Sequence, residues 1–250
     1  MKLIPKLMLW FFFSIAISPE AHSFLVSTAY QETAPKFILD EQGNPSGVCV
    51  DIFNAIENES SILEFSKPKD YVPIKRIFHN MEKGTVLIYC GAGFNKKRAE
   101  KFNYSNIPLY TIKTVLVGSR DIGRDLTSID DLRKYDDLTF SAIQGTSTYR
   151  LLKKLALPLS PQFVWKVDQG MALVARKKGS IFAYHSLGIL YVMKNNKWSG
   201  LKVLDVTLRE YQHSMLYSKY LPDKYKAEIE RTLKILKDNK TIDQIMLMYQ

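Results

Sequence analysis

The sequence predicts an α/β fold, and two observations lead to this prediction. Short apolar runs that suit strands alternate along the chain with segments whose apolar residues recur at helical spacing. The run at 85–90 is also apolar throughout, as expected for a strand that is covered on both faces of its sheet. Alternating strands and helices are typical of α/β proteins. The chain contains no internal repeat and no low-complexity segment.

Residues 1–23 have the composition of a secretory signal peptide. A basic start at 1–6 precedes about a dozen apolar or small residues, and small side chains at 21–23 suit signal peptidase. We therefore predict a mature chain from Phe24 in the periplasm; the alternative is an uncleaved N-terminal anchor, for which the apolar run is short. The first cysteine after this run is Cys49, so we do not expect a lipoprotein.

The first half of the mature chain predicts strands and helices in alternation. Its segments are a strand at 24–30, an extended piece at 35–39, a turn at 40–45, helices at 48–56 and 74–81, and a strand at 85–90. Asp51 lies in the first turn of the first helix, where a carboxylate is favourable. Gly84 ends the second helix.

The second half repeats this alternation. Its segments are a long strand at 110–117, a capped short helix at 127–132, a strand at 138–143, a turn at 144–147 into a helix at 148–155, a strand at 181–184, a helix at 187–194, extended pieces at 203–206 and 212–218, and two helices within 224–249.

Charge and cysteine content restrict the functional class. The formal net charge of +10 favours anionic ligands or surfaces. We expect no nucleic acid partner, because the chain lacks zinc-finger spacing and RNA-binding aromatic motifs and is exported. An even number of cysteines in an oxidising compartment allows a disulfide between Cys49 and Cys90; the alternative is two buried free thiols. We expect no metal site and no cofactor.

The turn at 143–151 is a generic anion site. Backbone N–H groups are unpaired at a helix start and attract negative charge. Gly145 allows close approach to the main chain, and Thr146 and Ser147 supply hydroxyls. The alternative is an ordinary helix cap.

Arg98 is the second candidate ligand residue. Its planar guanidinium matches a carboxylate in two parallel hydrogen bonds, which lysine cannot do. The alternative is a solvated side chain beside Lys96, Lys97 and Lys101.

The order of these pieces resembles the bacterial extracellular solute-binding proteins of family 3, the periplasmic receptors of polar amino-acid ABC importers and their relatives. The resemblance covers nearly the whole mature chain. Its matching positions are Gly43, Gly47, Val50, Asp51 and Ile52, then Asn95 to Arg98 with the following 104–110, then Ser128, Asp131, Leu132, Gly145 and Thr146.

The resemblance implies the two-lobed fold of the type II periplasmic binding proteins, in which each lobe is a mixed sheet flanked by helices and the lobes close on a small ligand. Lobe one would comprise 24–117, lobe two 118–206, and 207–250 would return to lobe one with the C-terminal helices. A hinge of two extended crossings is expected near 114–119 and 204–217.

The resemblance also implies a set of ligand contacts. Arg98 of lobe one would bind a ligand carboxylate, with Asn95 where the family has threonine. From lobe two, the same carboxylate would be contacted by Gly145, Thr146 and Ser147. Cys49 and Cys90 would lie on adjacent elements near the cleft, which favours their disulfide. Tyr30 and Tyr184 are the expected aromatic contacts, with Tyr89 and Tyr110 as alternatives, and His185 is expected to be structural.

Two positions depart from the family pattern. Phe182 stands where amino-acid receptors have an aspartate, and Ser186 or Leu187 stands near their second acid. Without these carboxylates an α-ammonium group has no counter-charge, so a standard amino acid is not the expected ligand.

The resulting functional hypothesis is a monomeric periplasmic binding protein rather than an enzyme. It would capture a small polar, carboxylate-bearing solute for an ABC permease or a sensor. One alternative is a periplasmic enzyme on the same fold that resembles the cyclohexadienyl dehydratases and acts on prephenate-like acids. The other is an interaction protein that retains the fold.

Overall fold

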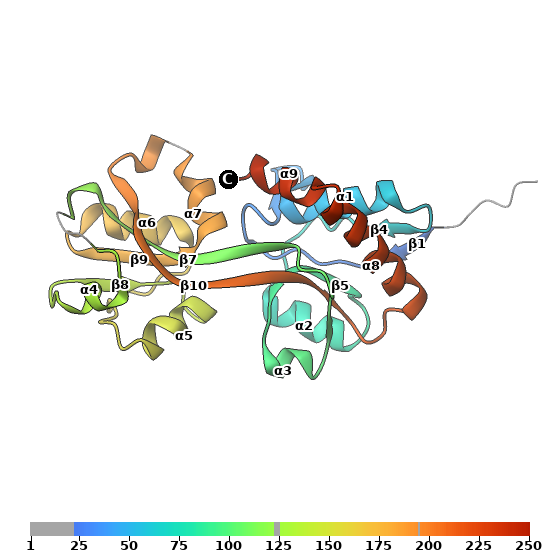
Figure 1. The fold of residues 1–250 in the computed structure, drawn as a ribbon, viewed down its shortest axis with the longest axis horizontal. Helices are drawn as coiled ribbons and strands as arrows, with labels where there is room; N and C mark the ends of the chain where they lie inside the picture. The colour runs from blue at the N-terminus through green and yellow to red at the C-terminus, as the bar shows by residue number, and fades with distance from the viewer. Residues whose placement is uncertain (1–22, 123–125, 195) are drawn as a thin grey trace, which may run out of the picture.

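A computed structural model describes residues 23–122, 126–194 and 196–250 as two lobes joined by two long strands (Figure 1). The predicted signal peptide at 1–23 lies outside this part except for Ser23. Every helix among the described residues is too short or too polar to cross a bilayer.

Lobe one is built from the first half of the chain and from its C-terminal helices. Its elements are β1 (Phe24–Val26), β2 (Ile38–Leu39), β3 (Pro45–Ser46), α1 (Val48–Glu59), β4 (Leu63–Phe65), α2 (Ile74–Glu82), β5 (Ile88–Gly93), α3 (Lys96–Ala99), β6 (Asn103–Tyr104), α8 (Asp223–Asp238) and α9 (Thr241–Met248). Apolar residues of all these helices except α3 pack into one core cluster.

Lobe two follows the first long strand, β7 (Tyr110–Ser119), and precedes the second, β10 (Leu201–Tyr217). Its elements are α4 (Ile129–Arg133), β8 (Thr139–Ser141), α5 (Ser147–Lys154), α6 (Val167–Arg176), β9 (Ser180–His185) and α7 (Ser186–Met193), with short 3-10 turns at Arg120–Ile122 and Asn196–Trp198. Two apolar clusters cover the two faces of its sheet.

One six-stranded sheet runs through both lobes. Its order is β5-β10-β7-β9-β8, and β6 also pairs with β10. β10 runs antiparallel to β5 and β7, whereas β8 and β9 are parallel. Because β7 and β10 pair along most of their length, they form the connection between the lobes (Figure 1). The predicted hinge segments fall on these strands, and their motion stays a prediction.

Local sequence explains where helices α1, α4 and α5 begin. Gly47 precedes α1 with φ 113°, and a Cβ there would lie 2.6 Å from the Pro35 carbonyl oxygen, so only glycine fits. The hydroxyl of Ser128 accepts a hydrogen bond from the Asp131 N–H and caps α4. Thr146 caps α5 in the same way.

The α/β prediction is confirmed, but several elements differ from the sequence-based expectation. The strand expected at 85–90 begins at Ile88 and continues to Gly93. The pieces expected at 203–206 and 212–218 form the single strand β10, with register shifts near Thr207. Helix α6 and strand β4 were not predicted from the sequence. The predicted lobe boundaries at 117 and 206 lie inside β7 and β10 and stay predictions.

Candidate functional site

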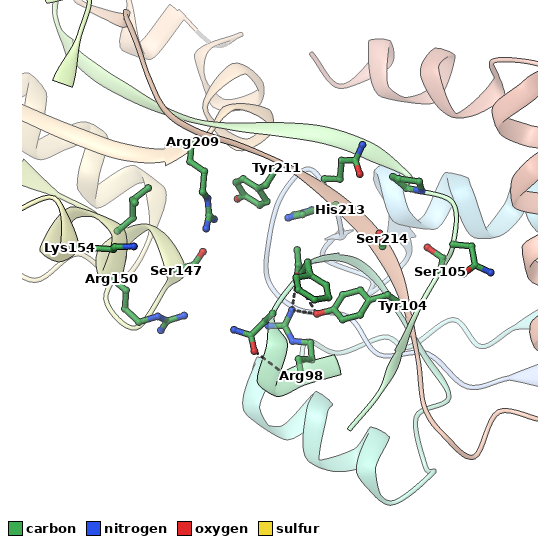
Figure 2. A pocket seen from close by; sticks show the side chains of 17 residues that line it. Arg98, Tyr104, Ser105, Ser147, Arg150, Lys154, Arg209, Tyr211, His213 and Ser214 are labelled. Carbon is green, nitrogen blue, oxygen red and sulfur yellow. Dashed lines mark hydrogen bonds between the residues drawn. The ribbon is translucent and has the colours of Figure 1, made fainter. Parts of the chain in front are cut away.

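A cavity of about 810 Å³ lies between the lobes and opens beside β10. Figure 2 shows its walls: Arg98 and Tyr104 belong to lobe one, Ser147, Arg150 and Lys154 to α5 of lobe two, and Arg209, Tyr211 and His213 to β10. A ligand in this cavity would therefore touch both lobes and one of the strands that connect them.

Arg98 forms the lobe-one wall. Its Nη1 donates hydrogen bonds to the Gly93 carbonyl oxygen at 2.8 Å and to the Tyr104 hydroxyl at 3.3 Å. Its Cζ lies 4.5 Å from the centre of the Phe78 ring, which supports the guanidinium from one side. Among the described residues no acceptor is found for its Nε and Nη2, so these donors are free to meet a ligand.

Asn95 fixes the start of α3, the helix that carries Arg98. Its Oδ1 accepts a hydrogen bond from the Arg98 backbone N–H at 3.0 Å. Asn95 lines the cavity, but this oxygen is occupied by the cap. The neighbours Lys96 and Lys97 are exposed, while Arg98 is half-buried, so Arg98 differs in burial from the two lysines; its role as a ligand contact stays a prediction.

β10 supplies a row of side chains along the cavity. Arg209, Tyr211 and His213 alternate along the strand, so they share a face. The Arg209 guanidinium lies 4.1 Å from the centre of the Tyr211 ring. The His213 ring lies 5.4 Å from the rings of both Tyr211 and Tyr110. These ring contacts, of which the two at His213 are tilted or edge-on, hold the row in place, and no ion pair with an acid is found for Arg209 among the described residues.

In lobe two the cavity reaches the first turns of α5. Ser147 is the first residue of the helix, and Arg150 donates from Nη1 to the Gly145 carbonyl oxygen at 2.9 Å. The Thr146 hydroxyl is engaged as the helix cap, donating to the Ile143 carbonyl oxygen at 2.6 Å and accepting from the Tyr149 N–H at 3.2 Å. Of the three residues predicted at this turn, Ser147 lines the cavity, whereas Gly145 and Thr146 are not among its lining residues.

The charged side chains among the described residues that line this cavity are all cationic. Four cationic side chains line it, and no Asp or Glu does so among the described residues. The cations are Arg98, Arg150, Lys154 and Arg209. Burial, and then the charge of Lys36, lowers the pKa of His213 well below its usual value, so its imidazole is neutral. The site therefore suits an anion.

The two predicted aromatic contacts lie outside the cavity. Tyr30 is 1% exposed and stacks on Phe37 in the lobe-one core, with ring centres 4.8 Å apart. Tyr184 is 7% exposed and lies against the rings of Phe182 and His185. Their contact with a ligand stays a prediction.

The two departures from the receptor pattern have structural counterparts. Phe182 is fully buried, and its ring occupies the space beside Gly170 of α6. Ser186 accepts a hydrogen bond from the Lys113 N–H at 3.2 Å, and Leu187 packs with the lobe-one core. Neither position offers negative charge to a ligand.

The predicted disulfide is present. Cys49 of α1 and Cys90 of β5 are bonded, and both are fully buried. Over the described part of the chain, the side chains form no group of three or more His, Cys, Asp and Glu that could hold a metal ion.

Sequence reasoning missed part of the cavity wall. It did not single out Arg150, Lys154, Arg209, Tyr211 or His213. The sequence does contain patterns that place these residues on common faces. Residues 209, 211 and 213 alternate within an extended run, which puts them on one face of a strand. Residues 150 and 154 lie four apart after a helix start, which puts them on one face of a helix. What the sequence does not show is that these two faces meet.

Comparison with known proteins identifies the family. The family model of bacterial extracellular solute-binding proteins, family 3, matches residues 26–249. The chain belongs to this family. No curated protein matches the chain in sequence.

Solved structures give the same fold for this family member. A probable amino-acid ABC transporter extracellular-binding protein, ytmK from Bacillus subtilis, has a TM-score of 0.77 at 12% identity, over 91% of this chain and 97% of that one. The GluR0 ligand-binding core in complex with L-glutamate has a TM-score of 0.74 at 13% identity, covering 92% and 98%. AncCDT-1, an ancestral amino-acid-binding protein and precursor of cyclohexadienyl dehydratase, has a TM-score of 0.69 at 18% identity, covering 91% and 95%. The fold is that of the type II periplasmic binding proteins, as the sequence predicted.

Proposed function

We propose that this solute-binding protein captures a small carboxylate-bearing anion between its lobes. The observation that carries the proposal is the set of four cations around the cavity with no carboxylate among the described lining residues. Such a lining attracts anions and disfavours the ammonium group of a standard amino acid.

Arg98 is the proposed anchor for the carboxylate. Nη1 is held by Gly93 and Tyr104, which leaves two donors of the planar fork for a bidentate contact. From lobe two, Ser147 and Arg150 face the same space, as Figure 2 shows. An anion that contacts both lobes stabilises the closed state over the open one.

The proposed setting follows from the family. Its members are extracellular solute-binding proteins, and several structural neighbours are described as parts of amino-acid ABC transporters. We place this chain in the periplasm, as a monomer that delivers its ligand to an ABC permease or a sensor.

A binding assay with matched variants tests the anchor. Wild type, Arg98→Ala and Lys97→Ala are titrated by calorimetry with monocarboxylates, dicarboxylates, keto acids and amino acids. Removal of Arg98 should weaken the best carboxylate by about 30-fold or more, since it leaves a desolvated charge unpaired. Lys97 is an exposed neighbour and serves as the control. A carboxylate that binds both variants equally well would contradict the proposal.

Wild type and a further variant, His213→Gln, test the enzymatic alternative. AncCDT-1 is described as a precursor of a dehydratase, so prephenate is added and aromatic product is followed by absorbance. General acid-base chemistry needs a titratable group aimed at the substrate, and His213 is the one imidazole among the described residues that line the cavity. Turnover by wild type that His213→Gln abolishes would replace the binding function with an enzymatic one.

A further inference from the structure

Lys36 is a buried cation behind the lobe-one wall of the cavity. It is 5% exposed, and its Nζ donates to the Tyr89 hydroxyl and the Gly91 carbonyl oxygen, both at 3.4 Å. These contacts are long and their acceptors are uncharged. Lys36 forms no ion pair with any residue that the structure describes. A lysine this deeply buried is rare without a partner of opposite charge.

The polar and titratable groups found near Lys36 come from several elements, and none of those that the structure describes is an acid. β5 contributes Tyr89, α3 Arg98, β9 His185 and β10 His213, and the Tyr110 hydroxyl of β7 lies near its aliphatic chain at Gly91. Tyr89 in turn donates to Gln31 at 2.9 Å. Arg98 and Lys36 repel each other, and burial together with this repulsion lowers the pKa of Lys36 to about 8.

Two polar atoms beside Lys36 are buried and lack a hydrogen-bond partner among the described residues. They are Nε2 of His185 and Nδ1 of His213. The other ring nitrogen of His185 accepts from the Gly188 N–H at 3.0 Å, so its orientation is fixed by the start of α7. Buried polar groups without partners are costly and need an explanation. His213 also lines the main cavity, so this group of buried side chains is connected to the cavity wall through His213.

We propose that Lys36, His185 and His213 form a second anion subsite, which receives the other end of a ligand held by Arg98. The ligand class is then a small dicarboxylate without an ammonium group. This inference rests on the proposed function, because the first carboxylate is assigned to Arg98. A carboxylate at the subsite would supply the counter-charge that Lys36 lacks and would accept hydrogen bonds from ring N–H groups of the two imidazoles.

A matched ligand pair measures the subsite. Malonate, succinate, glutarate and adipate are each titrated by calorimetry against their half-amides, which keep one carboxylate and nearly the same shape. Wild type should prefer the best dicarboxylate over its half-amide by about 10- to 100-fold, the range for one hydrogen-bonded charge. Lys36→Met should reduce this preference to about twofold, because the half-amide does not use the charge.

Controls separate the subsite from folding effects. Lys97→Met removes an exposed lysine of the same lobe and should keep the wild-type preference. Lys36→Met replaces an unpaired buried charge with an apolar chain of similar length, so it should unfold at no lower temperature than wild type. A variant that lost both the preference and its stability would overturn the assignment of Lys36 as a ligand contact.

The pH dependence gives an independent readout. A bound carboxylate favours the charged form of Lys36. The contribution of Lys36 to affinity is therefore complete below its pKa of about 8 in the free protein and is lost as the pH rises above that value. Wild-type affinity for the dicarboxylate should therefore fall above pH 8, with proton uptake on binding, whereas Lys36→Met should show a flat profile between pH 7 and 9.

The outcomes distinguish the two proposals. If wild type binds monocarboxylates through Arg98 but treats each dicarboxylate like its half-amide, the subsite is wrong and the proposed function stands. If Lys36→Met keeps the preference, the subsite is also wrong. If wild type binds no carboxylate at all, both proposals fail.

Discussion

Removal of the disulfide should cost this protein a large part of its stability. Cys49 and Cys90 are 41 positions apart, and closing a loop of that length lowers the entropy of the unfolded chain by an amount worth about 4 kcal/mol at 25 °C. We expect the double variant Cys49→Ala/Cys90→Ala to lose this free energy of unfolding. For a chain of this size the loss corresponds to a fall in Tm of roughly 8–16 °C.

Differential scanning calorimetry of three samples checks this value. They are oxidised wild type, wild type reduced under the same conditions, and the double alanine variant. The reduced protein and the variant should unfold at similar temperatures, both well below the oxidised protein. A fall of less than about 3 °C in both would refute the loop-entropy argument, since it would correspond to roughly 1 kcal/mol.

The disulfide also lies close to Lys36, the lysine of the proposed second anion subsite. Gly91 follows Cys90 with φ +78°, and a Cβ there would lie 2.6 Å from the Tyr110 hydroxyl, 3.0 Å from Cδ of Lys36 and 3.5 Å from Sγ of Cys49. The disulfide therefore packs directly beside the chain that presents Lys36. Its loss should reduce the dicarboxylate preference more than it reduces binding of a monocarboxylate at Arg98.

Two further predictions concern stability alone. Gly170→Ala would push a methyl group into the Phe182 ring, so the free energy of unfolding should fall by about 1–2 kcal/mol despite the better helix propensity of alanine. Gly200→Ala is the control, because a Cβ there meets nothing within 4 Å. Equal urea midpoints for the two variants would contradict this account of the packing. Hydrogen bonding from Arg231 lowers the pKa of Glu228 from 4.5 to about 2, so its contribution is present above pH 4.5 and lost as the pH falls towards 2. Glu228→Gln should weaken the dependence of the urea midpoint on pH between 4.5 and 2. A pH dependence equal to that of wild type would contradict the assigned contribution of Glu228.

Sequence patterns predicted the fold class because each pattern is local. Alternation of strands and helices needs only spacing, and the caps at Ser128 and Thr146 need only neighbouring residues. The same reasoning failed for α6, since Gly170 in its interior weakens the helical signal. The structure gives the reason for that glycine: it makes room for Phe182, which is 12 positions later in the chain.

The candidate site was predictable only in part for a related reason. Arg98 belongs to a segment whose family pattern is recognisable, and the structure places it in the cavity wall. The row on β10 was missed because register shifts near Thr207 interrupt the alternating pattern of a strand. Lys36 could not be found at all, since its burial depends on Tyr89 and Gly91, more than 50 positions away.

The distribution of cations over the two lobes suggests how ligand binding and closure are coupled. Arg98 lies on lobe one, and Arg150 and Lys154 lie on lobe two across the same cavity (Figure 2). If the lobes close as proposed, like charges that approach each other in a narrowing cleft would repel more strongly as water leaves, so closure without a ligand would be unfavourable. An anion between them would attract the cations of both lobes, which offsets their mutual repulsion and would favour the closed arrangement. A neutral solute of the same shape would leave the repulsion in place, so the charge that selects the ligand would also keep the protein open until that ligand arrives.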